Sequence, residues 1–281
     1  MSRLSLNQAT IKYADLATAL SVTTRAGIGS IGLWREPVAQ VGLAEAVRLV
    51  ADSGLRFSSL CRGGFFTTAD PAARQQALDE NRRAIDETAA LAAAGAPGSR
   101  PVLVLVAGGL PEGSRDLRGA RARAADAVAA LAGHAAAAGV VLAVEPMHPI
   151  YAADRGVVST LDQALDLVGD LPAEVAGVVV DTFHVWWDPD LATLIARAGR
   201  EGRIAAYQVC DWITPFPADA LLSRGLMGDG HVDFASVTRW VLDAGYTGDI
   251  EVEIFNQELW DADPAEVTQR VKKAYETTIG L

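Results

Sequence analysis

Two hydrophobic patterns alternate along the 281 residues of the chain. Short runs in which nearly every position is apolar are followed by longer stretches, rich in Ala and Leu, whose apolar residues recur every three or four positions. The first pattern is typical of strands buried on both faces, and the second of amphipathic helices. Eight strands are predicted, over residues 4–8, 29–34, 57–61, 101–106, 140–145, 178–181, 204–210 and 249–254. Eight helices are predicted to follow them in turn, over residues 15–25, 42–52, 71–94, 118–138, 160–168, 189–198, 234–244 and 264–278.

This alternation predicts parallel pairing, because consecutive parallel strands need a crossover connection, which is usually a helix. Eight units with no break in composition favour a closed barrel over an open sheet. A (β/α)8 barrel takes about 250 residues, so one such domain accounts for the length of the chain. The predicted fold is therefore an α/β protein, a single (β/α)8 TIM barrel over residues 1–281.

The charge balance of the chain argues against nucleic acid and membranes as partners. Asp and Glu number 35 against 24 Lys and Arg, a net charge of −11, and the arginines are scattered rather than clustered as a phosphate backbone would require. No apolar stretch reaches the roughly 20 residues of a membrane span, and the first residues lack the apolar core of a signal peptide.

Two cysteines, Cys61 and Cys210, are too few for a disulfide framework. We expect a cytoplasmic protein with free, buried thiols.

Three predicted strands end in a carboxylate. Glu145 ends the fifth strand, Asp181 the sixth, and Glu253 lies near the end of the eighth. Active sites of TIM barrels lie at the C-terminal ends of the strands, where these three side chains would meet. Each one alone is more often a helix cap, a member of a loop ion pair or a solvated group. Together they would repel one another and resist burial without a counter-charge, and a divalent cation would supply it.

The segments that carry these carboxylates are AVEPMHP, VVVDTFH and IEVEIFN, and a fourth segment, AYQVCDW, lies on the seventh strand. In this order they resemble the sugar-phosphate isomerase/epimerase-like superfamily, with its xylose-isomerase-like barrel, over nearly the whole chain. The resemblance implies that a Glu, an Asp, a His and a second Glu bind a divalent metal, commonly manganese, and that the two Glu exchange protons with the substrate. Glu145, Asp181 and Glu253 match three of these ligands, and Glu145 and Glu253 match the acid–base pair. His184 matches a histidine that contacts substrate in some epimerases.

The fourth ligand position departs from the family. Where the family commonly has His-x-x-Asp, this chain has Gln208-Val209-Cys210-Asp211. An amide oxygen coordinates hard cations, so the predicted metal ligands are Glu145, Asp181, Gln208 and Glu253. Such an all-oxygen set favours Mn²⁺ or Mg²⁺ over Zn²⁺. The alternatives are that His184 replaces Gln208 as a ligand, or that the metal binds weakly.

Three further residues near strand ends are candidates for contact with the substrate. Arg62 follows the third strand and is next to two glycines, Trp34 ends the second strand, and His148 lies three residues after Glu145. An Arg paired with a loop carboxylate, and a Trp in the core or at an interface, are the alternative interpretations. Glu251 faces the same side as Glu253 but lies one layer deeper, which indicates a paired or supporting role. The glycine-containing loop 224–233 is expected to approach the barrel mouth.

The resemblance implies a metal-dependent sugar isomerase or epimerase that moves a proton next to a carbonyl through an enediolate. The expected substrate is a sugar, a cyclitol or a sugar derivative, and a homo-oligomer is possible through the helices or loops. A lyase on the same barrel, similar to inosose dehydratases or to subunits of carbon-glycoside-cleaving enzymes, is an alternative. A non-catalytic sugar-binding barrel is another. Abasic-site endonucleases of the superfamily need a histidine-rich zinc cluster, which four histidines in an acidic chain argue against.

Overall fold

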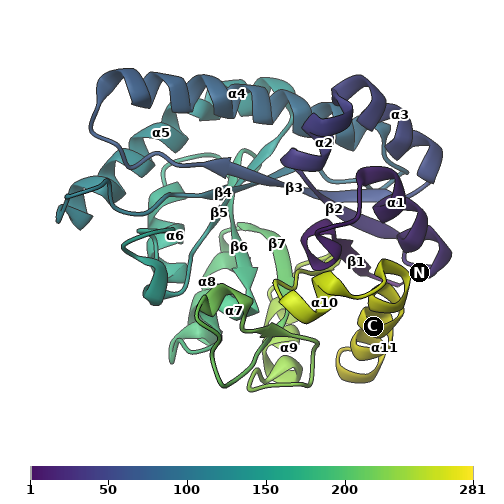
Figure 1. Ribbon diagram of the computed structural model, residues 1–281. Helices are drawn as coiled ribbons and strands as arrows, with labels where there is room; N and C mark the ends of the chain where they lie inside the picture. The colour runs from purple at the N-terminus through teal and green to yellow at the C-terminus, as the bar shows by residue number, and fades with distance from the viewer. Residues whose placement is uncertain (1, 281) are drawn as a thin grey trace.

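The computed structural model describes residues 2–280, and eight parallel strands in it close into a barrel (Figure 1). Their order around the barrel is β1-β10-β7-β6-β5-β4-β3-β2, and β1 closes the ring by pairing with both β2 and β10. The barrel strands are β1 Leu4–Asn7, β2 Ser30–Trp34, β3 Arg56–Gly64, β4 Val102–Val106, β5 Val141–Glu145, β6 Ala176–Asp181, β7 Ile204–Val209 and β10 Ile250–Val252. The predicted TIM barrel is confirmed.

Helices connect the strands and cover the outside of the barrel (Figure 1). The eight predicted helices are present as α1 Leu16–Arg25, α3 Leu43–Ser53, α4 Pro71–Ala94, α5 Leu117–Ala138, α6 Leu161–Val168, α8 Leu191–Arg200, α9 Phe234–Asp243 and α11 Pro264–Thr278. Side-chain caps determine where several of them begin. The carboxylates of Asp15, Asp70 and Asp263, for example, each accept a hydrogen bond from a backbone N–H in the first helical turn.

Several short elements were not predicted from the hydrophobic pattern. They include α2 Arg35–Val41, α7 Thr182–Val185, α10 Gln257–Asp261, and an antiparallel pair formed by β8 Asp211–Trp212 and β9 Arg224–Gly225. Elements of two to seven residues are too short to show a clear period. All of them lie in connections that follow barrel strands, so they help to shape the barrel mouth.

The barrel interior has a polar layer below the mouth, centred on Glu251. The Glu251 carboxylate accepts hydrogen bonds from Asn7 Nδ2 at 2.7 Å, Gln208 Nε2 at 2.8 Å, and the hydroxyls of Ser58 and Ser59. A Cβ at Gly32 would lie 2.5 Å from Glu251 Oε2, so this strand position has room only for glycine. The supporting role predicted for Glu251 agrees with this arrangement, which ties β1, β3, β7 and β10 together.

A second cluster of interior side chains is apolar. It is formed by small and branched side chains of neighbouring strands: Cys61, Val102, Val104, Ala143, Val179, Ala205 and Ala206. Glu145 follows Ala143 by two residues and therefore points inward, as the strand alternation predicted. Between residues 2 and 280, no helix combines the length and hydropathy that crossing a membrane requires.

Candidate active site

The three predicted carboxylates meet at the C-terminal mouth of the barrel. Glu145 ends β5, Asp181 ends β6 and Glu253 follows β10, and their exposed fractions are 6%, 1% and 4%. Ligand atoms of Glu145, Asp181 and His184 all lie within 4.8 Å of one another. Glu253 joins this group through a shared arginine, Arg224.

Arg224 is the component of the site that was not predicted. Its Nη1 lies 2.8 Å from Glu253 Oε2 and 3.3 Å from Asp181 Oδ2, and only 2% of the residue is exposed. The rings of Phe183 and Phe255 lie 4.5 Å and 4.7 Å from its guanidinium carbon. The guanidinium is therefore a buried cation between two of the carboxylates, held on the faces of two aromatic rings.

Two polar side chains hold the segment that presents Arg224. Asn256 Nδ2 donates to the Arg224 carbonyl at 2.9 Å. The Asp211 carboxylate accepts the backbone N–H groups of Gly228, Gly230 and Val232, so it anchors the glycine-containing loop that follows β9. The sequence offered one signal for this site residue, because Arg224 begins the loop that was expected at the mouth.

Burial and mutual repulsion raise the pKa values of the three carboxylic acids. Burial raises the pKa of Glu145 well above its usual range, and the charges of Asp181 and Glu253 add to this effect. Burial also raises the pKa of Asp181, against the lowering effect of Arg224. The pKa of Glu253 is raised to about 7, mainly by burial, while Arg224 again opposes the shift. The single guanidinium of Arg224 thus does not compensate the negative charge of the three carboxylates. A further cation would compensate it.

Gln208 lies next to this group on β7, opposite Asp181 in the strand register. Its Nε2 donates to Glu251, which leaves Oε1 buried without a hydrogen-bond partner. A buried, unpaired amide oxygen beside incompletely compensated carboxylates is a donor set that fits a hard divalent cation. The residues predicted as ligands thus fit such an ion, and coordination by Gln208 stays a prediction.

His184 is completely buried against the carboxylates. Its Nδ1 accepts the backbone N–H of His148 at 3.0 Å, and its Nε2 lies 3.8 Å from Asp181 Oδ2. Burial lowers the pKa of His184 well below its usual range, and Arg224 lowers it further. The imidazole is therefore neutral, and its Nε2 lies 3.2 Å from Nη2 of Arg224 at the wall of the inner cavity.

The structure places the remaining predicted residues in different positions. Trp34 and Arg62 both line the mouth, and the Trp34 indole nitrogen donates to Asn7 Oδ1 at 2.7 Å. The guanidinium carbon of Arg62 lies 5.5 Å from the centre of a Trp34 ring. The His148 ring instead packs on Trp212, with centroids 4.7 Å apart, so His148 contributes to the site through the backbone N–H that orients His184.

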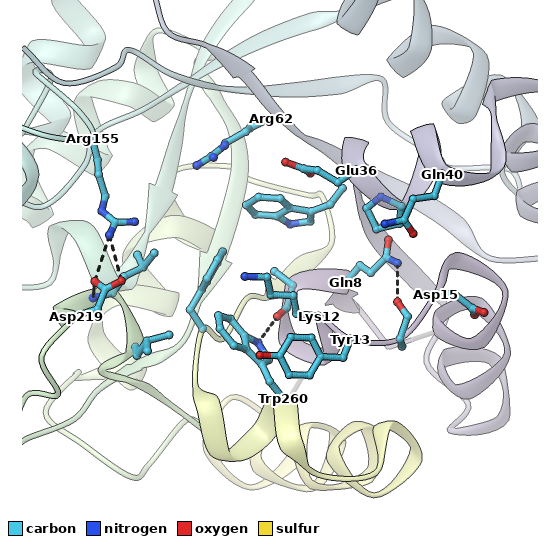
Figure 2. A pocket seen from close by; sticks show the side chains of 17 residues that line it. Gln8, Lys12, Tyr13, Asp15, Glu36, Gln40, Arg62, Arg155, Asp219 and Trp260 are labelled. Carbon is cyan, nitrogen blue, oxygen red and sulfur yellow. Dashed lines mark hydrogen bonds and ion pairs between the residues drawn. The ribbon is translucent and has the colours of Figure 1, made fainter. Parts of the chain in front are cut away.

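Two cavities meet at the mouth. The inner one, of about 40 Å³, is lined by Glu145, His184, Arg224 and Glu253, together with the thiol-bearing Cys61. Burial and the neighbouring carboxylates raise the pKa of that thiol well above its usual range, so it is an inert lining group. The outer cavity, of about 670 Å³, extends over β1 and β2 (Figure 2).

An ion pair bounds both cavities on one side. Arg155 Nη2, from the connection after β5, lies 3.1 Å from an Asp219 carboxylate oxygen in the connection between β8 and β9 (Figure 2). Leu221, two residues after Asp219, also lines both spaces. Two separate connections thus meet over the carboxylates.

Comparison with known proteins agrees with this geometry. The family described as xylose isomerase-like TIM barrel matches residues 20–276. The chain is 25% identical to the L-ribulose 3-epimerase of Mesorhizobium japonicum over 276 residues, 95% of this chain and 86% of that protein. The crystal structure of protein SMc04130 from Sinorhizobium meliloti 1021 is 46% identical, covers 98% of each chain and has a TM-score of 0.92. The IolI protein with a bound zinc atom, 20% identical with a TM-score of 0.82 over 99% of this chain and 98% of that one, shows the same fold.

Proposed function

Since the chain belongs to the xylose isomerase-like TIM-barrel family, we propose that it is a metal-dependent isomerase or epimerase of sugars. The proposed reaction moves a proton next to a carbonyl and passes through an enediolate. The relative named L-ribulose 3-epimerase supports a ketose or a related sugar derivative as the substrate class. We further propose that the whole chain forms one catalytic domain, acting in the cytoplasm.

The observation that carries this proposal is the position of Glu145 and Glu253. Both line the inner cavity, and they reach it from strands β5 and β10, which β6 and β7 separate in the barrel. A substrate carbon between them would be accessible to a proton acceptor on one side and a proton donor on the other. The pKa of about 7 for Glu253 suits a group that gains and loses a proton near neutral pH.

The proposed metal ligands are Glu145, Asp181, Glu253 and the amide oxygen of Gln208, with Mn²⁺ or Mg²⁺ preferred. A divalent cation there would polarise the substrate carbonyl and stabilise negative charge that develops on its oxygen. His184, neutral and at the wall of the inner cavity, would contact a substrate oxygen. Arg224 would keep Asp181 and Glu253 oriented toward the cavity through its ion pairs.

Return of the proton decides the product. If the second glutamate returns the proton to the opposite face of the same carbon, the result is an epimer. If the proton goes to the neighbouring carbon, an aldose and a ketose interconvert. Loss of a hydroxide from the enediolate instead would make the protein a lyase, which the products distinguish directly.

The test measures metal content and proton exchange together. Protein purified without added metal is analysed for bound elements, loaded with Mn²⁺, and incubated in deuterated water with a panel of ketoses, aldoses and inososes. We expect near-stoichiometric metal and deuterium incorporation at one substrate carbon, both lost in Glu145→Gln/Glu253→Gln. Glu174→Gln, an exposed carboxylate far from the cavities, is the matched control and should retain both. Wild-type protein that binds no metal even after loading would refute the metal-dependent mechanism.

A further inference from the structure

The outer cavity is much larger than the inner cavity beside the carboxylates. Its volume is about 670 Å³, against about 40 Å³ for the inner cavity beside the carboxylates. The two spaces share a boundary formed by the side chains that line both: Trp34, Arg62, Arg155, Leu221 and Phe255. Pockets of roughly 300–1,000 Å³ hold ligands of drug size, so a ligand that starts at the carboxylates can continue into this space.

The wall of the outer cavity is a connected row of aromatic rings. Trp34 and Phe255 lie with their centroids 5.5 Å apart, Phe255 and Trp260 5.7 Å apart, and Trp260 and Tyr13 6.0 Å apart. The row begins beside the inner cavity, which Trp34 and Phe255 also line, and ends at Tyr13 on the outer rim (Figure 2). Aromatic faces of this kind pack well on the C–H face of a sugar ring or on a planar aryl group.

The two indoles of this row are fixed before any ligand binds. Trp34 Nε1 donates to Asn7 Oδ1, and Trp260 Nε1 donates to the carbonyl of Ala9, each at 2.7 Å. Their polar atoms are therefore satisfied within the protein, and the rings keep their orientation. A rigid aromatic wall loses little conformational entropy when a ligand packs on it.

Polar groups above and below the wall are free to contact a ligand. Figure 2 shows Arg62 at the upper edge of the cavity and Lys12 near Trp260 at the lower edge. Lys12 Nζ lies 4.3 Å from the centre of a Trp260 ring, and neither Lys12 nor Arg62 has an ion-pair partner among residues 2–280. Both cations can therefore donate hydrogen bonds to hydroxyl or ring oxygens.

We propose that the outer cavity is a second subsite, which binds a ring attached to the reacting sugar. The substrate is then a keto-glycoside, or a disaccharide whose reducing end opens to a carbonyl, rather than a free monosaccharide. This inference rests on the proposed function for the identity of the reacting unit. The attached ring packs along the row on its more exposed members, Trp34 and Tyr13, beside Lys12 over Trp260, while the reacting sugar lies toward the carboxylates.

The test compares matched methyl and phenyl glycosides. Dissociation constants are measured by titration calorimetry on manganese-loaded protein, using both glycosides of D-glucose, D-galactose, D-mannose and D-xylose, with cellobiose and lactose as second-sugar probes. For at least one sugar we expect the larger ligand to bind about tenfold more tightly than its methyl partner, because the added ring buries apolar surface on the aromatic wall. The class that gains more, phenyl glycoside or disaccharide, identifies the attached ring.

The ratio of the dissociation constant of the methyl glycoside to that of the larger ligand, called the preference here, should fall to about one in Trp260→Leu. It should be unchanged in Trp240→Leu, because Trp240 belongs to α9 and lies outside both cavities. If Trp260→Leu does not fold, Tyr13→Ala and Lys12→Ala test the same wall from its exposed end, and each should reduce the preference. Absence of any preference across the panel, or its persistence in these variants, would overturn the subsite. The methyl and phenyl glycosides have no carbonyl and serve only as binding probes, so exchange is measured on cellobiose, lactose and the free sugars. Tighter binding of the larger ligands without exchange in any of these reducing sugars would leave the subsite standing and refute the catalytic proposal. Deuterium exchange without tighter binding of the larger ligands would support the catalytic proposal and overturn the subsite.

Discussion

Replacing Arg224 by glutamine should destabilise the metal-free protein, and by more at higher pH. The guanidinium contacts Asp181 and Glu253 at 3.3 Å and 2.8 Å, and all three side chains are at most 5% exposed. Removing one partner of a buried ion pair costs about 3–5 kcal/mol, since it leaves a buried charge uncompensated. Glutamine keeps hydrogen-bonding capacity and much of the volume, so the loss isolates the charge.

Protonation sets how much of this cost is observed. A carboxylate that lacks its cation can take up a proton instead, at a cost of about 1.4 kcal/mol for each pH unit above its pKa. The pKa of Glu253 is about 7 with Arg224 beside it, and removal of the arginine raises this pKa further, so protonation relieves most of the loss near pH 6 and less of it as the pH rises toward 9. We expect the free energy of unfolding to fall by about 1 kcal/mol or less at pH 6 and by up to about 3–5 kcal/mol at pH 9.

Thermal unfolding in the presence of a chelator measures both values. One kcal/mol shifts the midpoint by about 2–4 °C in a protein of this size, so the expected drop at pH 9 is about 6–20 °C. The control is Arg197→Gln, whose guanidinium contacts Asp162, Asp166 and Glu201 on the surface and should contribute only about 0–1 kcal/mol. Equal midpoints for the two variants at pH 9, or a drop independent of pH, would refute the reasoning.

Three further predictions concern the same region. In the metal-free wild type, the folded state binds more protons than the unfolded state between the usual pKa of Glu253, 4.5, and its raised value of about 7, so stability should fall as the pH rises through this window. Chemical denaturation across that range checks the sign, and a rise in stability would contradict it. Glu251→Gln should lower the free energy of unfolding by about 2–4 kcal/mol, because its amide group places a hydrogen-bond donor among the four donors that surround this side chain. The control Glu45→Gln, on the surface, should lower it by less than about 0.5 kcal/mol. Gln208→His should raise the affinity for Zn²⁺ at least about tenfold relative to Mn²⁺ in chelator competition, since imidazole is a preferred zinc ligand; unchanged selectivity would argue against position 208 as a ligand.

The barrel and its carboxylates could be predicted for one physical reason. A parallel strand covered on both faces has few polar positions, so strands such as Val102–Val106 are nearly uniform in hydrophobicity. A charge at the end of such a strand, as with Glu145 and Asp181, is conspicuous and needs a partner. The two-residue period separated inward from outward positions, which also placed Glu251 one layer below Glu253.

Arg224 could not be located in the same way. It lies on a two-residue strand in a long connection, where no period exists, and its position depends on Asn256 and on Asp211, 32 and 13 positions away. The orientation of His148 is likewise tertiary, because the packing of its ring on Trp212 leaves only its backbone N–H to contact the site. Hydrophobic patterns identify which strand ends meet, whereas the loops that cover them are determined by individual hydrogen bonds.

The ion pair between Arg155 and Asp219 has a consequence for the rate of ligand entry. The inner cavity of about 40 Å³ has room for an ion or a few water molecules, and a sugar ring is larger. A sugar ring therefore reaches the carboxylates only when the lining of this cavity moves, and the two connections that this pair joins contribute Arg155 and Leu221 to that lining. Association should accordingly be slower than diffusion allows and limited by the opening step. Because the pair is partly exposed, added salt weakens it, so moderate ionic strength should accelerate the binding of a neutral sugar.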